Sequence, residues 1–333
     1  MKYTVVTGAS GHVGNTLVRA LLEQGRRVRA LIHTQATSLD GLDVERIDGD
    51  VLDADSLDRA FAGAEVVYHL AAHISITGDQ GGRVTAVNVE GTRNAARAAL
   101  AAGVRRFVHF SSVHAFDLEP LDAPIDEQAG RPGPKHPAYD RSKAAGEAAL
   151  REVIALGLDA TIVNPTGVIG PNDHEPSRMG RLIGLIGRRR IPAMTPGGFD
   201  WVDVRDVAAA ALAAETRGRT GVNYLLGGEW LSMDDVAAHA ARAHGVAPPR
   251  FRSPMWAARL GAPFVTLAAK MARAEPLYTS EALHAVRANR QIDCTRARSE
   301  LGHRPRPAAE SIADAVAWAK AHGGASAAEE RPA

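Results

Sequence analysis

Tyr139 and Lys143 lie four positions apart in a stretch that is predicted to be helical, so their side chains share one face of that helix. A free tyrosine has a pKa near ~10 and is a weak proton donor or acceptor at neutral pH. A neighbouring ammonium group lowers this pKa because it stabilises the phenolate. Ser112 follows an apolar run, and its hydroxyl could hydrogen-bond a carbonyl oxygen. The three side chains therefore predict proton transfer at a carbonyl or alcohol group.

A glycine-rich turn follows the first apolar run of the chain, and a helical pattern begins directly after it. In such a turn Gly8 permits the tight bend, Gly11 lets the backbone approach a pyrophosphate, and Gly14 lets the helix pack closely on the strand. The helix would present free N–H groups and the positive end of its dipole to the phosphates. The context predicts a dinucleotide site rather than an ordinary glycine turn, with contacts from Gly8, Ser10, Gly11, His12, Val13 and Gly14.

The end of the second predicted strand bears on the choice of cofactor. An acidic residue there would accept a hydrogen bond from the 2′-hydroxyl of NAD, whereas a cation favours the 2′-phosphate of NADP. The strand ends at His33 with no Asp or Glu, which favours NADP over NAD, unless His33 is only a solvated loop residue. Asp50 and Val51 follow a further short strand. Asp50 could accept a hydrogen bond from the adenine amine, or serve as a helix cap.

The first half of the chain alternates short apolar runs with helical patterns. Strands alternating with helices predict βαβ units and an α/β fold with a doubly wound parallel sheet, and continuous apolar strands fit burial on both faces. The predicted strands are 3–6, 28–32, 66–70, 107–110 and 160–163, and the predicted helices are 13–22, 84–102 and 138–156.

The second half predicts a smaller, mostly helical lobe interleaved with the last strands. Ser232 has the features of a helix N-cap. The predicted helices are 179–190, 206–214, 232–244, 256–272, 280–286 and 309–321, with strands at 201–204 and 223–226 and a linker at 248–254. We predict a nucleotide domain from 1–165 and about 200–227, a substrate lobe from about 166–199 and 228–322, and a disordered tail at 323–333.

These motifs together resemble those of the extended short-chain dehydrogenases/reductases, the NAD-dependent epimerase/dehydratase superfamily. The resemblance covers about residues 1–171, and within the superfamily it is nearest to dihydroflavonol-reductase-like and hopanoid-associated sugar-epimerase-like members. The matching segments are Thr7-Gly8-x-x-Gly11-x-x-Gly14, Gly49-Asp50-Val51-x-Asp53, His69-Leu70-Ala71-Ala72, Asn88-x-x-Gly91-Thr92, Ser111-Ser112, Tyr139-x-x-x-Lys143, Asn164-Pro165 and Gly170-Pro171.

The resemblance implies a role for each matching residue. Tyr139 would be the acid/base, Lys143 its activator and a ligand of the cofactor ribose, and Ser112 the donor to the carbonyl. Asn88 would hold the site or a water relay. The remaining cofactor contacts would be Leu70, Ala71, Ala72, Pro165, Thr166, Gly167 and Val168. The resemblance also implies a homodimer formed through the helices at 84–102 and 138–156.

One departure from the family pattern bears on the substrate. Nucleotide-sugar epimerases carry an Arg–Asp pair where this chain has Phe199-Asp200, so a cation for substrate phosphates is missing at that position. The aromatic side chains of Phe199 and Trp201 indicate a more apolar substrate, unless they only pack in the core. We expect substrate contacts from these two residues and from His73 and His114.

Three functions follow in order of preference. The first is an NAD(P)-dependent carbonyl reductase or alcohol dehydrogenase that uses Ser112, Tyr139 and Lys143. The second is a sugar epimerase or dehydratase. The third is a regulator that binds the cofactor without turnover, which the presence of Tyr139 and Lys143 disfavours.

Composition excludes several classes of protein. Of 333 residues, 39 are basic and 38 acidic, and this balance gives no strong field for nucleic acid or an anionic membrane. The single cysteine, Cys294, excludes an internal disulfide. The apolar runs are too short to span a membrane or form a signal peptide, which predicts a cytoplasmic protein with a small-molecule substrate. His69 and His73 share the spacing of helical zinc ligands but sit at a strand end, so we expect no metal site.

Overall fold

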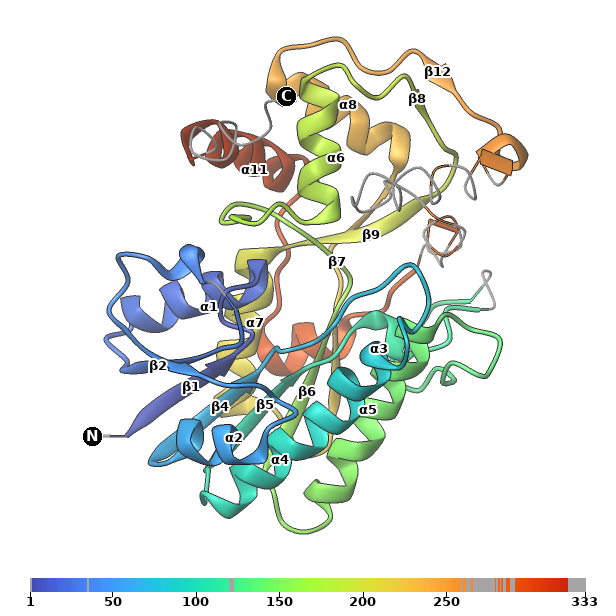
Figure 1. Ribbon diagram of the computed structural model, residues 1–333. Coiled ribbons are helices and arrows are strands. Elements are labelled where there is room, and N and C mark those ends of the chain that lie inside the picture. The colour runs from blue at the N-terminus through green and yellow to red at the C-terminus, as the bar shows by residue number, and fades with distance from the viewer. Residues whose placement is uncertain are drawn as a thin grey trace.

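A seven-stranded sheet forms the base of the molecule in the computed structural model, which describes residues 2–34, 36–119, 123–258, 260–261, 265, 279, 281, 283, 286–287 and 291–322 (Figure 1). The strand order is β10-β6-β5-β4-β1-β2-β3, and every neighbouring pair is parallel. This arrangement confirms the predicted doubly wound fold. The strands are β1 (Tyr3–Thr7), β2 (Val28–Ile32), β3 (Val44–Asp48), β4 (Ala64–His69), β5 (Arg106–Phe110), β6 (Ala160–Pro165) and β10 (Asn223–Leu226).

Helices cover both faces of this sheet, so the central strands are buried on both sides and consist mainly of apolar residues. Alternate residues serve opposite faces: Val6 and Tyr68 pack in one core cluster, and Val5 and Phe107 pack in the other. One face carries α1 (His12–Glu23) and α7 (Val204–Arg217), and the other carries α2 (Ala54–Phe61), α4 (Gly91–Ala101) and α5 (Ala138–Ile154).

The helix expected over 84–102 is present over 83–101, but it is not α-helical throughout. It begins as the short α3 (Arg83–Thr85), widens into a π-helical turn, η2 (Ala86–Glu90), and continues as α4. Helix α5 approaches this turn closely, because a Cβ at Gly146 would lie 2.4 Å from the carbonyl oxygen of Asn88. The wide turn therefore displays Asn88 toward α5, and such single π turns are frequent at functional sites.

A lobe stands on the carboxyl ends of the sheet strands (Figure 1). It holds a three-stranded sheet in the order β11-β9-β7, and the strand expected over 201–204 belongs to this sheet rather than to the large one. Ser232 caps α8 in a reciprocal capping box with Asp235, as predicted. The lobe elements are β7 (Gly167–Ile169), α6 (Arg178–Gly187), β8 (Ala193–Met194), β9 (Gly198–Asp203), β11 (Glu229–Ser232), α8 (Met233–His244), β12 (Phe251–Arg252) and α11 (Ala308–His322).

Three single-turn elements complete the described structure: η1 (Thr37–Leu39), η3 (Val113–Ala115) and η4 (Ala297–Leu301). The predicted helices 256–272 and 280–286 fall largely outside the described residues, and the predicted tail 323–333 falls wholly outside them. Within the described part of the chain, each helix is too short or too polar to cross a membrane.

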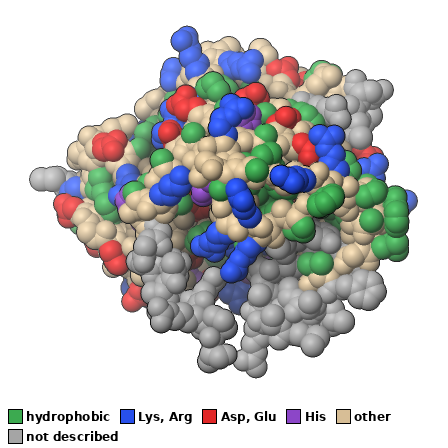
Figure 2. All heavy atoms as spheres, turned by 90° about the horizontal axis from the view of Figure 1, so that it is seen from above, with side chains coloured by type: hydrophobic (Ala, Val, Ile, Leu, Met, Phe, Trp, Pro, Cys, Tyr) green, Lys and Arg blue, Asp and Glu red, His purple; other side chains and the backbone are tan. Residues whose placement is uncertain are grey.

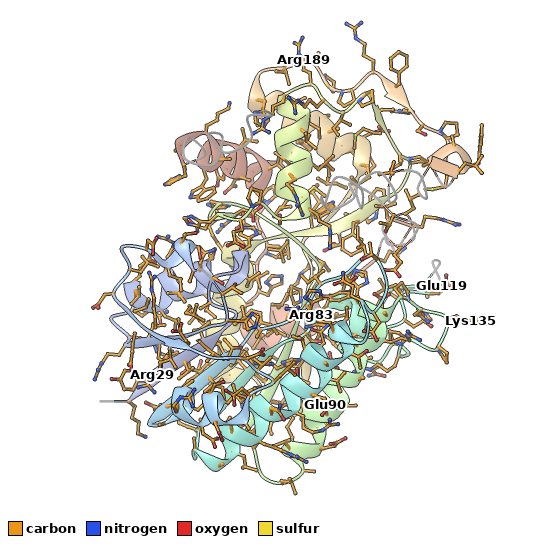
Figure 3. All side chains as sticks on the ribbon, viewed as in Figure 1. Arg29, Arg83, Glu90, Glu119, Lys135 and Arg189 are labelled. Carbon is orange, nitrogen blue, oxygen red and sulfur yellow. The ribbon has the colours of Figure 1, made fainter. Side chains whose placement is uncertain are left out.

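The outer end of the lobe is rich in basic side chains. Figure 2 looks onto this end and shows Lys and Arg side chains gathered on it, with hydrophobic side chains beside them. Arg189 projects from its tip (Figure 3).

Candidate active site

A cavity of about 1280 Å³ opens at the carboxyl edge of the large sheet, beside the point where the strand order reverses between β1 and β4. This reversal is where doubly wound sheets bind their ligands. The cavity brings together nearly all residues that the sequence predicts for the site. Its lining includes Gly8, Ser10, Gly11, His12, Val13, Gly14, His33, Asp50, Val51, Leu70, Ala71, Ala72, His73, Ser112, His114, Tyr139, Lys143, Pro165, Thr166, Gly167, Val168 and Phe199.

The three glycines of the turn are required for different reasons. Gly8 has φ +68°, and a Cβ there would lie 2.7 Å from the backbone nitrogen of Ala71. A Cβ on Gly14 would lie 2.1 Å from the carbonyl oxygen of Gly8. A Cβ on Gly11 would meet only that same oxygen, at an ordinary 3.5 Å. Backbone packing within the protein therefore excludes a side chain at Gly8 and at Gly14. At Gly11 the protein leaves room for a Cβ.

That open space faces the start of α1. Gly11 is the N-cap of α1 and no side chain caps the helix, so the first N–H groups remain available. Backbone donors at a positive helix end, next to a residue without a side chain, suit a pyrophosphate. The turn therefore fits the phosphates of a dinucleotide.

The two residues predicted for the adenosine end contact each other. His33 Nε2 lies 3.2 Å from Asp50 Oδ2, and both side chains are exposed to the cavity mouth. The other carboxylate oxygen of Asp50 accepts a hydrogen bond from the backbone of Leu52 (2.9 Å). Asp50 thereby holds the His33 ring at the end of β2.

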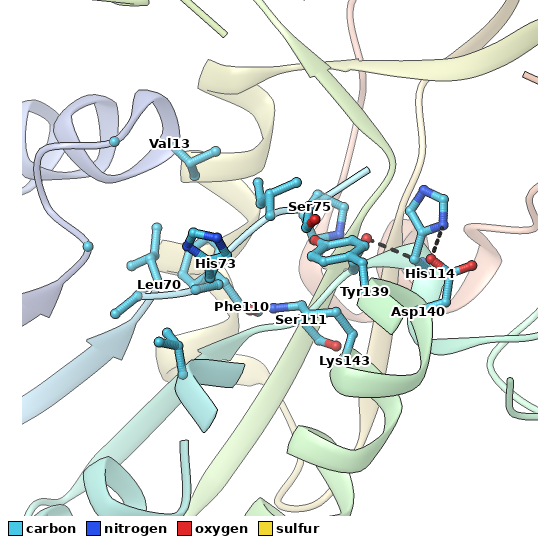
Figure 4. Close-up of a pocket in the computed structure, with 18 of the residues that line it drawn as sticks. Val13, Leu70, His73, Ser75, Phe110, Ser111, His114, Tyr139, Asp140 and Lys143 are labelled. Carbon is cyan, nitrogen blue, oxygen red and sulfur yellow. Dashed lines mark hydrogen bonds and ion pairs between the residues drawn. The ribbon is translucent and has the colours of Figure 1, made fainter. Parts of the chain in front are cut away.

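Ser112, Tyr139 and Lys143 come together from two elements. Ser112 lies two residues after the end of β5. Tyr139 lies in the first turn of α5 and Lys143 one turn later (Figure 4). A hydrogen bond links the side chains of Ser112 and Tyr139. Lys143 Nζ donates to the carbonyl oxygen of Phe110 (3.0 Å), which fixes the buried ammonium below the tyrosine.

Burial controls the protonation of this group. It raises the pKa of Tyr139 to about 12; the Ser112 hydrogen bond acts against this rise, and the charge of Asp140 adds to it. The lowered tyrosine pKa expected from the sequence is therefore wrong for this structure. Burial also lowers the pKa of Lys143 to about 8, although Glu147 opposes it. Tyr139 consequently keeps its proton at neutral pH and can act as an acid.

A buried polar network holds the back of α5. Glu147 accepts hydrogen bonds from the side-chain amides of Asn164 (2.7 Å) and Asn223 (2.9 Å) and pairs with Arg131 (2.9 Å). Asn164 also donates to the carbonyl oxygen of Ser112 (3.0 Å). The network ties α5 to β6 and β10 and fixes the backbone of Ser112.

Asn88 lies behind the cavity wall rather than in it. Its side chain accepts from the backbone N–H of His73 (2.7 Å) and donates to the His73 carbonyl (3.0 Å) and to Ser142 Oγ (2.8 Å). These three bonds make Asn88 a positioning residue for the loop after β4.

The predicted substrate residues separate into two groups. His114 lies with Nδ1 3.2 Å from Asp140 Oδ1 (Figure 4), and its ring stacks on that of Phe199 with 5.6 Å between the ring centroids. Trp201 lies one layer back: it is 8% exposed and packs against Gly167 and Phe199, so it supports the wall.

Sequence reasoning missed some charged residues of the cavity. Asp140 and Arg178 both line it and act electrostatically on Tyr139. The position of Asp140 directly after Tyr139 in the sequence could have indicated that it belongs to the site. Its contact with His114 could not be predicted, because the two residues are 26 positions apart. Arg83 and Arg287 also line the cavity, and so do the carboxylates of Asp117, Glu119 and Glu281, so charges of both signs border it.

His69 has a structural role. Its Nδ1 lies 2.8 Å from the Thr7 hydroxyl, and its ring stacks on that of His109. Burial lowers the pKa of His69 to about 3, so it is neutral beneath the site. Across the described residues, no group of three or more His, Cys, Asp or Glu is arranged to hold a metal ion.

Comparison with known proteins gives concordant matches. Residues 4–227 match the model of the NAD dependent epimerase/dehydratase family. Over 327 residues the chain is 38% identical to sterol demethylase protein B of Methylococcus capsulatus, covering 96% of this chain and 99% of that protein. It is 35% identical to a putative dihydroflavonol 4-reductase of Synechocystis, and the match covers 96% of this chain and 94% of that protein. The crystal structure of gox2253 superposes with a TM-score of 0.82 at 34% identity, covering 97% and 99% of the two chains.

Proposed function

The chain belongs to the NAD dependent epimerase/dehydratase family, and from this premise we propose that it is an NAD(P)-dependent carbonyl reductase or alcohol dehydrogenase. One observation carries the proposal. The protonated Tyr139, hydrogen-bonded to Ser112, faces the same cavity as the glycine turn, with Lys143 directly behind it. This arrangement can polarise a carbonyl group and give it a proton.

In the proposed reaction the nicotinamide, when bound, supplies or accepts the hydride. Ser112 and Tyr139 hold the carbonyl oxygen between their hydroxyl groups, and Tyr139 passes its Oη proton to that oxygen as the alcohol forms. The Lys143 ammonium stabilises the resulting phenolate and is placed to bind a ribose hydroxyl. Asn164 and Asn88 fix the backbone on either side of these groups.

We propose a mainly apolar carbonyl compound as the substrate. The Phe199 and Phe116 rings and Ile74 line the cavity near Tyr139 and provide apolar contact. A relative with 38% identity along nearly the whole chain is named for sterol demethylation, which supports a large apolar substrate. The homodimer implied by the family likeness, formed through α4 and α5, is part of the same proposal.

The direct test is a cofactor oxidation assay. NADPH and NADH absorbance would be followed with a panel of ketones and aldehydes, including 3-keto steroids, after thermal shift has shown which cofactor binds. Turnover of a carbonyl with net cofactor oxidation supports the proposal. Interconversion of UDP-sugars without net cofactor oxidation would refute it.

A sugar epimerase is the second candidate, and the arginines of the cavity favour it. Arg83, Arg178 and Arg287 line the cavity and could bind substrate phosphates in place of the missing family arginine. Incubation with UDP-glucose and NAD separates the candidates, because an epimerase returns the cofactor to its starting state.

We propose NADP as the preferred cofactor, and replacing His33 tests this. His33→Ser removes the donor at the end of β2, so affinity for NADP should fall about tenfold, the cost of a charge-assisted hydrogen bond. Affinity for NAD, measured by the same titration, serves as the internal control and should change little. An equal loss for both cofactors would mean that His33 does not contact the 2′-phosphate.

The buried lysine predicts a pH dependence. The pKa of Lys143 is about 8 and that of Tyr139 about 12, so below pH 8 the ammonium and the phenol coexist. As pH rises through about 8 the ammonium is lost, and kcat/KM for carbonyl reduction should fall about tenfold per pH unit. Lys143→Arg keeps its charge at this pH and should remove the inflection. An inflection that persists in this variant would assign it to another group.

A further inference from the structure

The chain has a net charge of only +1, but its charged residues are unevenly distributed along the sequence. Residues 176–199 contain five arginines, and residues 236–274 contain five arginines and one lysine. Neither segment contains an Asp or Glu, so the rest of the chain holds 28 basic against 38 acidic residues. Segregation of this kind concentrates positive potential on one part of the molecule.

The fold brings described parts of these two segments together at the outer end of the lobe. Strand β8 from the first pairs with β12 from the second, and α6 packs on α8 (Figure 1). Arg188, Arg189, Arg190 and Arg250 are exposed there, and no carboxylate of the described residues pairs with any of the four. The neighbouring Arg252 pairs with Asp234 at 3.0 Å.

Large apolar side chains stand exposed beside these arginines. Phe251 is 70% exposed, Trp256 67% and Leu260 65%. They account for three of the six large hydrophobic side chains that are exposed in the described structure, and they fall within ten positions of sequence. Figure 2 shows hydrophobic and basic side chains intermixed on this end of the molecule. Clustered apolar exposure of this kind marks an interaction site.

An open groove lies at this end of the lobe and shares one lining residue, Arg287, with the large cavity. It holds about 730 Å³ and is lined by Pro196, Gly197, Met255, Trp256, Leu260 and Arg287. Arg287 also lines the large cavity, and Phe199, two positions after Gly197, forms the cavity wall beside His114. The groove therefore borders the substrate end of the cavity rather than the glycine turn.

We propose that this basic–apolar face, made of Arg188, Arg189, Arg190, Arg250, Phe251 and Trp256, docks on a membrane surface rich in anionic phospholipid, from which the substrate enters through the groove. Arginines attract the anionic headgroups, whereas Trp and Phe enter the interfacial layer. The apolar side chains of Leu260 and Met255 would make favourable contacts with lipid acyl chains but not with a nucleic acid. The route for the substrate rests on the proposed function; docking itself does not.

Vesicle flotation tests the docking. The full-length protein is mixed with vesicles of phosphatidylcholine alone or with about one third phosphatidylglycerol, at low salt and at about 0.5 M salt. Binding is expected only to the anionic vesicles, and it should weaken at the higher salt. The triple variant R188S/R189S/R190S should partition about a hundredfold more weakly, and F251S/W256S at least tenfold more weakly.

Matched controls separate docking from general surface effects. Leu156 is 69% exposed in the turn that follows α5, away from the lobe, and L156S should bind like the parent. R59S/R97S/R304S removes the same charge from exposed positions elsewhere and should weaken binding far less than the lobe triple. Thermal unfolding of each variant confirms that it is folded.

Several results would overturn the proposal. These are an absence of binding to anionic vesicles, equal binding to neutral ones, or equal losses in the lobe and control variants. If light scattering shows that F251S/W256S dissociates a dimer while no vesicles are bound, the face is an interface between copies of the chain. Because flotation requires no turnover, failure of carbonyl reduction would refute the proposed function without affecting this result.

Discussion

The Tyr139→Phe variant is expected to lose about 10²–10⁴-fold in kcat for carbonyl reduction while it retains cofactor binding. In the proposed reaction the phenol gives its proton to the carbonyl oxygen, and phenylalanine preserves the ring that borders His114 at 5.8 Å. Since the high pKa of Tyr139 keeps it protonated, the loss should be similar at pH 6 and pH 8. Stopped-flow measurement of hydride transfer at saturating cofactor provides the readout.

A distant tyrosine supplies the control. Tyr3 lies on β1, where its hydroxyl accepts a hydrogen bond from Arg27 (2.6 Å), and Tyr3→Phe should leave kcat unchanged. A Tyr139→Phe enzyme that kept more than about a tenth of the activity would exclude Tyr139 as the proton donor and leave Ser112 or an ordered water in that role.

Alanine at Gly14 should destabilise the fold much more than alanine at Gly11. At Gly14 the new Cβ would overlap the carbonyl oxygen of Gly8 at 2.1 Å and approach Ala9 Cα at 2.9 Å. Both obstacles are backbone, so the turn must shift; we expect a loss of about 1–3 kcal/mol in the free energy of unfolding, together with loss of cofactor binding. At Gly11 the nearest atom is at 3.5 Å, and we expect a loss of no more than about 1 kcal/mol.

The cofactor separates these variants further. Gly11→Ala places a methyl group in the space left open for the pyrophosphate, so affinity for NADP should fall at least about tenfold in a protein of nearly normal stability. Urea unfolding and fluorescence titration measure the two effects independently. Normal cofactor affinity in Gly11→Ala would place the phosphates away from the start of α1 and contradict the site as described.

The features that could be predicted from the sequence depend on local patterns. The strands at 28–32 and 223–226 match β2 and β10 because their apolar runs are bounded by turn residues. The helix cap at Ser232 could be predicted because its partner, the Asp235 carboxylate, lies only three positions later. The cavity lining follows from motifs at the carboxyl ends of successive strands, which a parallel sheet must bring to one edge.

Other features depend on contacts between distant segments. The π turn at Ala86–Glu90 accommodates α5, which no pattern within 84–102 encodes. Strands β8 and β12 contain two residues each and form only because they pair with each other. The pKa of Tyr139 was predicted in the wrong direction because spacing reveals the lysine four positions away, whereas burial depends on the whole fold.

The position of β10 has a consequence for synthesis of the chain. This strand covers β6 at the edge of the large sheet, yet it lies beyond residues 166–222, which build much of the lobe. Until Asn223 has left the ribosome, β6 is an open edge, and Glu147 lacks one of its buried amide partners. The nascent seven-stranded sheet therefore remains incomplete and prone to intermolecular strand pairing until part of the lobe has been made. A fragment made by a single cut can therefore hold all seven strands of this sheet only if it also holds residues 166–222.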